Sequence, residues 1–526
     1  MPQIMIHIII IALGLCGLLI WSWITKPAIK IPSAGSKWPF LGSLRSLTKG
    51  KEILLSVYQK QLIDDRPYFL PGIFGDSIVL PPSMLPWLVA QPENHLSAKW
   101  AQLDALNIPT TFLRPEIGVD PTHEPLIRRE LTANLDVVEA DMWDEVGRAL
   151  EELWGSDTER WRVVVLDDTI RRVVARASSR VFTGQDLCAN NNFVESTIRY
   201  VTHVSTYGLI LNLVPRRFLR NLAGKLVQLP IATAYARCAQ HLLPLFEDLV
   251  SRHSKGQKLR PHLFASWLVT SAATRFPPSS PERTPDFLGR RLMALNFATI
   301  HTSTLTACNL LLDVFSGSPA VSGALRDEAL AFAAEWGPAE CRRERLNGMR
   351  RLDSALRESM RLWGVAPRTL RRRVMRPGGV ALPNGGDGIR LAEGTTVCIS
   401  GWGLHHDERL YSRAFDYVHD RFMRKAEVQG KGEPEEGEKV VKPGCAAAAA
   451  VETDEHFSAW GIGKHACPGR FFAVDFVKMI MAHVLVDYEV EVLAKRPDNL
   501  WIEYNIIPSP GASLSVRRRK PYMAQG

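Results

Sequence analysis

The chain has 526 residues, 46% hydrophobic and 23% charged, so it is long and apolar enough to bury a large core. Its eight cysteines are scattered without C-x-x-C spacing, which argues against a zinc-ligand array and against a secreted disulfide framework. The formal net charge of +9 suits an anionic membrane surface or an acidic protein partner, and no motif for binding nucleic acid accompanies it.

Residues 1–25 are predicted to form a transmembrane anchor. The segment from Ile4 to Ile24 is almost wholly apolar, and a helix needs about 20 such residues to cross a hydrocarbon core. Trp21 and Trp23 stand at its end, where amphipathic rings favour the membrane interface. Lysines follow the segment and none precedes it, which predicts a single-pass protein with its main domain in the cytosol. The alternative is a cleaved signal peptide, which normally has a basic stretch before its apolar core.

The rest of the chain is expected to form a proline-containing linker over 26–41 and one catalytic domain over 42–526. Its periodicity predicts a mainly α fold with small β-sheets. Helices are expected at 138–154, 191–212, 232–253, 285–316, 345–363 and 470–487, and strands at 77–80, 162–166, 389–391 and 396–399. A low-complexity stretch over 428–451 is predicted to be a surface loop, because its composition cannot form a core.

Within 292–312, polar side chains recur at spacings of three and four residues, which places them on one face of a helix. They are Asn296, Thr299, Thr302, Ser303 and Thr306. Such a stripe can also belong to a core helix whose hydroxyl groups bond to the carbonyl groups of the preceding turn. Further along, Glu358 and Arg361 stand three residues apart, the spacing of a helical side-chain pair. Periodicity alone favours a solvated pair, since the apolar residues around them form another face.

The strongest motif is the string from Trp460 to Ala473, which contains a single cysteine, Cys467. Pro468 suits the first position of a helix. Cys467 is therefore expected at a helix N-terminus, where free N–H groups and the helix dipole stabilise a thiolate. Gly463 and Gly469 lack side chains where a flat ligand would approach the backbone. The alternative is a buried structural cysteine.

This string resembles the haem-binding signature of the cytochrome P450 family, in which five residues recur at fixed spacing. Here they are Trp460, Gly463, His465, Cys467 and Gly469, and the family usually has phenylalanine in place of Trp460. The resemblance covers the chain from about residue 30 to its end. It implies the cytochrome P450 fold, haem b as cofactor, and Cys467 as the axial ligand of the iron. A thiolate ligand favours O–O cleavage.

The same resemblance assigns roles to the other motifs. The stretch from Ala298 to Ser303 is similar to the family's oxygen-activation sequence, which implies that Thr302 helps to deliver protons. His301 replaces the family's acid, so either His301 or water would relay them. Glu358, Arg361 and Arg421 match a structural triad of the family. His465, Arg128 and Arg372, or its neighbour Arg371, match the cationic partners of the haem propionates, although Glu124 stands where the family usually has tryptophan.

The resemblance implies a monooxygenase of the endoplasmic reticulum membrane that inserts one oxygen atom from O2 into a lipophilic molecule. The residues of the Cys467 string and of the stretch up to Ser303 are similar to those of fungal secondary-metabolism members of the family, notably terpenoid oxidases. NADPH electrons would come from a separate NADPH–cytochrome P450 reductase, since the chain has no nucleotide or flavin fingerprint. Alternatives are a reductase-independent haem–thiolate isomerase that rearranges peroxides, and a membrane-anchored haem sensor or electron carrier. Thr302 argues against the first, and the apolar stretches around 200–230 argue against the second.

Overall fold

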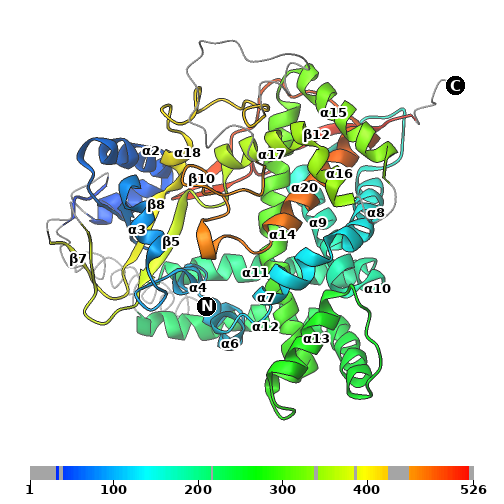
Figure 1. Ribbon diagram of the computed structural model, residues 1–526, viewed down its shortest axis with the longest axis horizontal. Helices are drawn as coiled ribbons and strands as arrows, with labels where there is room; N and C mark the ends of the chain where they lie inside the picture. The colour runs from blue at the N-terminus through cyan, green and yellow to red at the C-terminus, as the bar shows by residue number, and fades with distance from the viewer. Residues whose placement is uncertain are drawn as a thin grey trace, which may run out of the picture.

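The structure is a computed structural model that describes residues 31–34, 39–214, 217–336, 342–383, 388–423 and 449–520. Helices dominate it (Figure 1). The longer ones are α2 (Pro39–Asp64), α8 (Leu135–Trp154), α9 (Leu166–Thr183), α11 (Asn191–Asn212), α12 (Arg217–Ser254), α13 (Phe264–Arg275), α14 (Pro285–Phe315), α15 (Pro319–Ala334), α17 (Arg350–Trp363) and α20 (Arg470–Asp487). The shorter ones are α3 (Leu85–Ala90), α4 (Ala98–Ala105), α5 (Ile108–Thr111), α6 (Pro115–Val119), α7 (Glu124–Leu126), α10 (Gln185–Cys188), α16 (Arg342–Gly348) and α18 (Gly401–His405).

The β-structure is a minor part of the described chain. The largest sheet has five strands in the order β1 (Tyr68–Leu70), β2 (Ser77–Leu80), β8 (Thr396–Ser400), β5 (Arg368–Val374) and β3 (Leu96–Ser97). Within it, β2 and β8 are parallel and the other pairs are antiparallel. The smaller sheets are β4–β12–β9 (Arg162–Val165, Ser513–Arg518, Tyr488–Val490), β10–β11 (Leu500–Ile502, Asn505–Ile507) and β6–β7 (Val380–Ala381, Arg390–Leu391).

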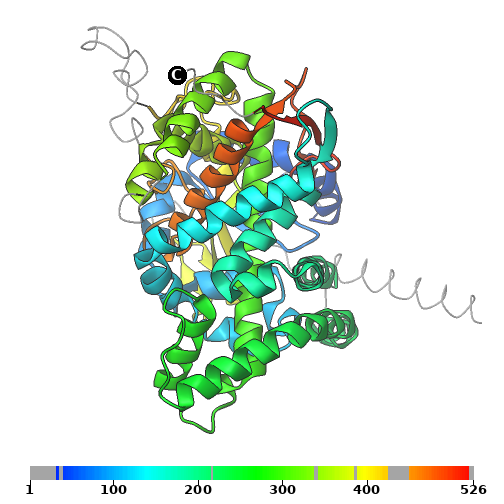
Figure 2. The same ribbon diagram turned by 90° about the vertical axis from the view of Figure 1, so that its right-hand side faces the viewer.

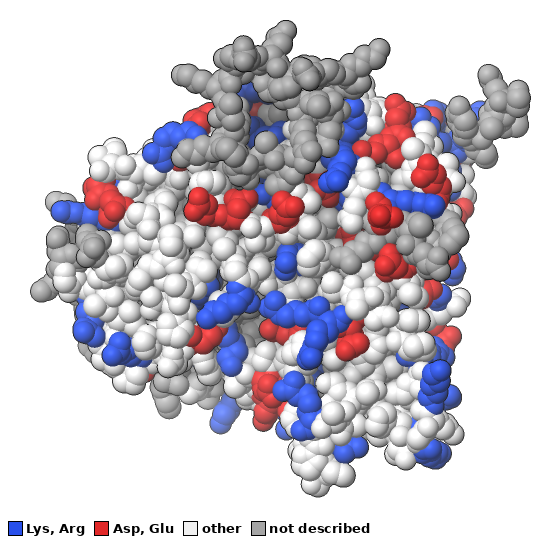
Figure 3. Space-filling model, in the orientation of Figure 1, with Lys and Arg blue, Asp and Glu red and all other residues white. Residues whose placement is uncertain are grey.

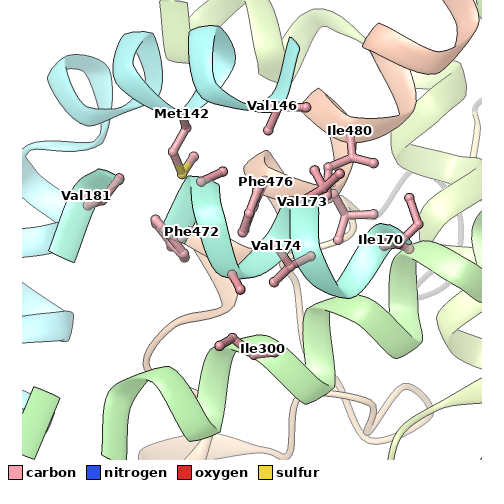
Figure 4. Close-up of a cluster of buried hydrophobic side chains, with 14 of the residues drawn as sticks. Met142, Val146, Ile170, Val173, Val174, Val181, Ile300, Phe472, Phe476 and Ile480 are labelled. Atoms are coloured by element: carbon pink, nitrogen blue, oxygen red, sulfur yellow. The ribbon is translucent and has the colours of Figure 1, made fainter. Parts of the chain in front are cut away.

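The main core lies where α8, α9, α14 and α20 meet (Figure 4). Val146 of α8, Val173 of α9, Ile300 of α14 and Phe476 of α20 are each 0% exposed. Apolar residues at helical spacing thus form faces that bury one another, which removes their surface from water. Helix α14 runs through the middle of the molecule, and α11 and α12 pack side by side along one flank (Figures 1 and 2). A long buried helix of this kind holds its polar stripe in a fixed place.

The predicted mainly α fold with small β-sheets is confirmed, but the predicted elements differ from the structure in several places. Helices α2, α13 and α15 and several of the short strands were not predicted. Helix α9, which the sequence pattern did not predict, follows β4 directly; its Val-Val and Ser-Ser pairs have weak helix propensity. Helix α12 extends N-terminally past the predicted start at 232, through Pro230. The predicted strand over 389–391 forms the two-residue β7, Arg390–Leu391.

The predicted linker over 26–41 and the predicted surface loop over 428–451 each end within the described residues. The remainder of the loop and the anchor lie outside them. Pro39, placed in the linker, begins α2. Most of the predicted surface loop over 428–451 is outside the described residues, but its end is not exposed: Ala450 is 0% exposed and its N–H donates to Asp353. The predicted anchor at 1–25 is likewise outside them. Across the described ranges, from residue 31 to residue 520, no helix is long and apolar enough to cross a membrane.

Candidate functional site

Cys467 lies in a hydrogen-bonded loop that leads into α20. Its backbone N–H donates to the carbonyl oxygen of Trp460 at 2.8 Å, which closes the loop on itself. The indole N–H of Trp460 donates to the carbonyl oxygen of Ala450 at 2.7 Å, so the ring is held in place. Gly461 and Gly463 have φ of +74° and +66°, the left-handed region that favours glycine. Helix α20 begins at Arg470, as the predicted helix over 470–487 does, with Gly469 as its N-cap and Pro468 immediately before the cap.

The thiol of Cys467 is under opposing influences. Burial, the largest effect, raises its pKa, and Glu124 acts in the same direction. The backbone N–H of Gly469 and the cations Arg470 and Arg128 act the other way. Since the net pKa is raised, the helix N-terminus alone does not stabilise a thiolate, which differs from the expectation. A bound metal cation would change that balance, because a coordinating thiol is deprotonated.

Part of the polar stripe of α14 faces a cavity between α14, α17, α20 and the cysteine loop. Thr302, Ser303, Thr306 and Asn309 line it from α14. The opposite walls are Ser359, Met360 and Trp363 of α17, Trp460 of the cysteine loop, and Ala473 and Val477 of α20. The structure therefore brings the α14 stripe and the cysteine loop to one cavity.

Thr302 is exposed in this structure and lines the cavity, whereas His301 is turned elsewhere. The Thr302 hydroxyl donates to the carbonyl oxygen of Ala298 at 2.7 Å, the bond expected of a core helix, and it also reaches the cavity. Burial lowers the pKa of His301, whose ring also interacts with the backbone of Val201 in α11. His301 thus carries a neutral ring directed toward α11.

Three predicted cationic residues meet beside the cysteine loop. Arg128, in the turn after α7, directs Nη2 toward the carbonyl oxygens of Lys464 and Ala466 at 3.4 and 3.5 Å. Arg372 of β5 is 3% exposed, and its Nη1 donates to the carbonyl oxygen of Arg371 at 3.0 Å. Burial and the charge of Arg372 lower the pKa of His465, and Arg128 acts in the same direction. Among the described residues, Nε and Nη2 of Arg372 and Nε2 of His465 are buried without a hydrogen-bond partner.

Glu358, Arg361 and Arg421 form a buried triad. Arg361 donates from Nε and Nη2 to both oxygens of Glu358 at 2.8 Å, the two-pronged geometry that a guanidinium group allows. Arg421 donates from Nε to the same carboxylate at 2.9 and 3.0 Å. The side chains of Glu358 and Arg361 are both 0% exposed, so the interpretation as a solvated pair is wrong.

A second buried acid, Asp313 of α14, lies beside the cavity and was not predicted from the sequence. It accepts hydrogen bonds from the hydroxyl of Ser359 at 2.6 Å and from the indole N–H of Trp363 at 3.0 Å, and it pairs with Arg496. Asn309 precedes Asp313 by four residues and accepts from Nη2 of Arg496 at 2.8 Å. The sequence signal for these two residues was the continuation of the polar stripe of α14 past residue 306, to Asn309 and Asp313.

Comparisons with known proteins agree with this geometry. The family model described as Cytochrome P450 matches residues 140–513. Cytochrome P450 monooxygenase polB of Polytolypa hystricis is 27% identical over 493 residues, which cover 91% of this chain and 90% of that protein. Cytochrome P450 monooxygenase 71 of Postia placenta is 30% identical over 510 residues, which cover 94% and 95%. The crystal structure of the cytochrome P450DA heme domain has the same fold, with a TM-score of 0.64 at 16% identity over 93% of this chain and 98% of that one.

Proposed function

The chain belongs to the cytochrome P450 monooxygenase family, and on that premise we propose that it inserts one oxygen atom from O2 into a lipophilic small molecule. The balanced reaction consumes the substrate, O2, NADPH and a proton, and yields the oxygenated product, water and NADP⁺. The observation that carries the proposal is the meeting of the Cys467 loop and the polar face of α14 at one cavity.

Family membership implies haem, and the residues present fit it. A cysteine sulfur is the soft donor that haem iron accepts in this family, and a thiolate-ligated haem supplies O2 activation with O–O cleavage. Arg372 and His465 would hold the propionates, because burying a guanidinium group with free N–H groups is costly unless an anion joins it. Gly469 supports the same fit. A Cβ there would lie 3.8 Å from Ile127, an ordinary contact, so packing within the chain does not explain the glycine. Room for a ligand beside the backbone would explain it.

The chain's own residues have three further roles in this proposal. Thr302 places its hydroxyl group at the cavity wall, where its oxygen can accept a hydrogen bond from water in a proton relay. His301 is a less direct candidate for the proton relay, because its ring faces α11 and not the cavity. The triad of Glu358, Arg361 and Arg421 keeps α17 in place beneath the cavity. The apolar wall formed by Val474 and Val477 excludes water from the reacting centre.

Electrons would come from NADPH–cytochrome P450 reductase. The support is electrostatic: the chain has a net charge of +9, and Figure 3 shows lysines and arginines in a line across the middle of one face. Such a line attracts an acidic partner and guides its approach.

We place the protein in the endoplasmic reticulum membrane, held by the apolar segment over 1–25. A second feature supports contact with lipid. Leu222, Leu226 and Leu229 follow one another at spacings of four and three on α12 and are 56, 67 and 67% exposed. Large apolar side chains that gather on one exposed helix face favour an apolar environment. A terpenoid or related fungal metabolite, already dissolved in the membrane, is the proposed substrate class.

Labelled oxygen tests this function. Microsomes that contain the protein and its reductase are incubated with a metabolite extract under isotopically labelled O2, with and without NADPH. A product that requires NADPH and carries the label is expected. Product formed without NADPH would favour the isomerase alternative, and NADPH-dependent product without label would indicate desaturation. A haem sensor or electron carrier would yield no product.

A further inference from the structure

His405, the last residue of α18, lies between the buried triad and the loop that carries Cys467. Its carbonyl oxygen accepts a hydrogen bond from Nη1 of Arg361. Its ring Nε2 accepts one from the backbone N–H of Ser458 at 3.1 Å. The residue is 5% exposed, so water does not compete for either bond. One residue therefore connects the triad to the start of the cysteine loop.

Ser458 is the point from which that loop is built. Its carbonyl oxygen accepts from the hydroxyl of Thr369 at 3.1 Å and from the backbone N–H of Gly461 at 2.9 Å. Two residues later, Trp460 accepts the N–H of Cys467 at 2.8 Å. A displacement of Ser458 would consequently pass through two backbone hydrogen bonds to the sulfur ligand.

The ring of His405 suits an acceptor role. It stacks on Phe457, with ring centroids 5.5 Å apart and an interplanar angle of 21°. Burial and the charge of Arg361 lower the pKa of His405 to about 3. The ring is thus neutral at physiological pH, and a neutral imidazole keeps one nitrogen free to accept a hydrogen bond.

We propose that His405 is a positioning residue for the haem ligand: by accepting the N–H of Ser458, it fixes the loop so that Cys467 stays on the iron. The inference rests on the proposed function, because it requires Cys467 to be the ligand. His405 does not touch the cavity lining and acts through Ser458 and Trp460. Without it, Ser458 would have a buried N–H group with no acceptor, which is costly to leave unpaired.

Three substitutions separate the hydrogen bond from mere packing. In His405→Gln the side-chain oxygen lies near the position of Nε2 and can accept the Ser458 N–H. In His405→Asn the side chain is too short for its oxygen to reach the Ser458 N–H, and in His405→Leu there is no acceptor. Val173→Ala, in the core of α9, is a control for general loss of stability. The full-length haem-loaded proteins are compared by their haem content, by their thermal unfolding, and by the spectrum of their reduced carbon monoxide complex.

The spectrum distinguishes a thiolate-ligated haem from one that has lost its thiolate. We expect His405→Leu and His405→Asn to lose most of the thiolate-type band, while His405→Gln and Val173→Ala keep it. Glutamine and asparagine variants with the same spectrum would overturn the proposal, even if the leucine variant fails to fold. A wild-type protein without a thiolate-type band would instead overturn the assignment of Cys467, and with it the proposed function.

Discussion

The Thr302 hydroxyl and the His301 ring are neighbours in sequence but lie in different surroundings. Thr302 lines the cavity, and His301 is buried against α11 with a lowered pKa. The family resemblance left the proton relay open between His301 and water. The geometry favours Thr302 with water, since a relay group must lie within hydrogen-bond reach of the proton that it moves.

Replacing Thr302 by valine, which has the same shape without the hydroxyl, should separate NADPH consumption from product formation. We expect product per NADPH to fall on the order of 100-fold, with hydrogen peroxide released in its place. His301→Ala is the matched comparison and should change the ratio far less. Both quantities are measured in one incubation with the reductase. A larger effect for His301→Ala would assign the relay to histidine.

Some site residues could be predicted from sequence and others could not. Cys467 stands in a contiguous string, so the spacing within one loop was enough to find it. Periodicity alone placed Glu358 and Arg361 on a solvated face, because it cannot show that Arg421, sixty residues later, pairs with Glu358. Only the family resemblance indicated the triad. Asp313 and His405 were missed for the same reason: their partners, Arg496 and Ser458, are distant in sequence.

Helix α17 carries a fully buried pair of opposite charges. Its Glu358 and Arg361 are fully enclosed, and Arg361 also donates to the carbonyl oxygen of Ala414 at 2.7 Å. A buried pair is not in itself strongly stabilising, but removing one partner leaves an uncompensated charge. The helix therefore tolerates loss of the arginine poorly.

Arg361→Leu should lower the free energy of unfolding by about 3–5 kcal/mol, together with haem content. Arg252→Leu breaks an exposed pair with Asp248, in which both side chains are more than half exposed, and is expected to cost about 0–1 kcal/mol. Denaturant unfolding of the two variants gives the comparison. Equal losses would mean that the triad contributes no more than a surface pair.

At the level of elements, hydrophobic periodicity located most of the long helices. It did not indicate α2, α9, α13 or α15, and it missed the N-terminal part of α12, including Pro230, because that helix was expected to begin at 232. Proline usually interrupts a helix, yet α12 continues through it. Packing against α11 and α14, which no local pattern reveals, accompanies the longer helix.

As a whole molecule, the chain combines a cavity enclosed by helices with an exposed apolar surface on one of them. Helix α12, which carries these exposed leucines, packs beside α11 along one flank (Figure 2). If the anchor holds the domain at a membrane, this flank is the one whose chemistry suits contact with lipid. A substrate dissolved in lipid would then be concentrated close to the domain.

Hydroxyl-radical footprinting of the full chain, in lipid vesicles and in detergent-free buffer, tests that orientation. Leu222, Leu226 and Leu229 should be oxidised less in vesicles, because lipid excludes water from them. Val163 in β4 and Val492 in the segment after β9, which are 70 and 46% exposed, serve as internal controls and should react equally in both. Unchanged oxidation of the three leucines would contradict the proposed contact.

Replacement of Cys467 by serine tests whether this residue is the haem ligand of an O2-using enzyme. The reduced carbon monoxide complex of Cys467→Ser is compared with that of the wild type and of Cys238→Ser, a buried cysteine in α12. We predict a thiolate-type spectrum for the wild type and for Cys238→Ser, and its complete loss in Cys467→Ser. A thiolate-type spectrum that survives in Cys467→Ser would show that another residue binds the iron.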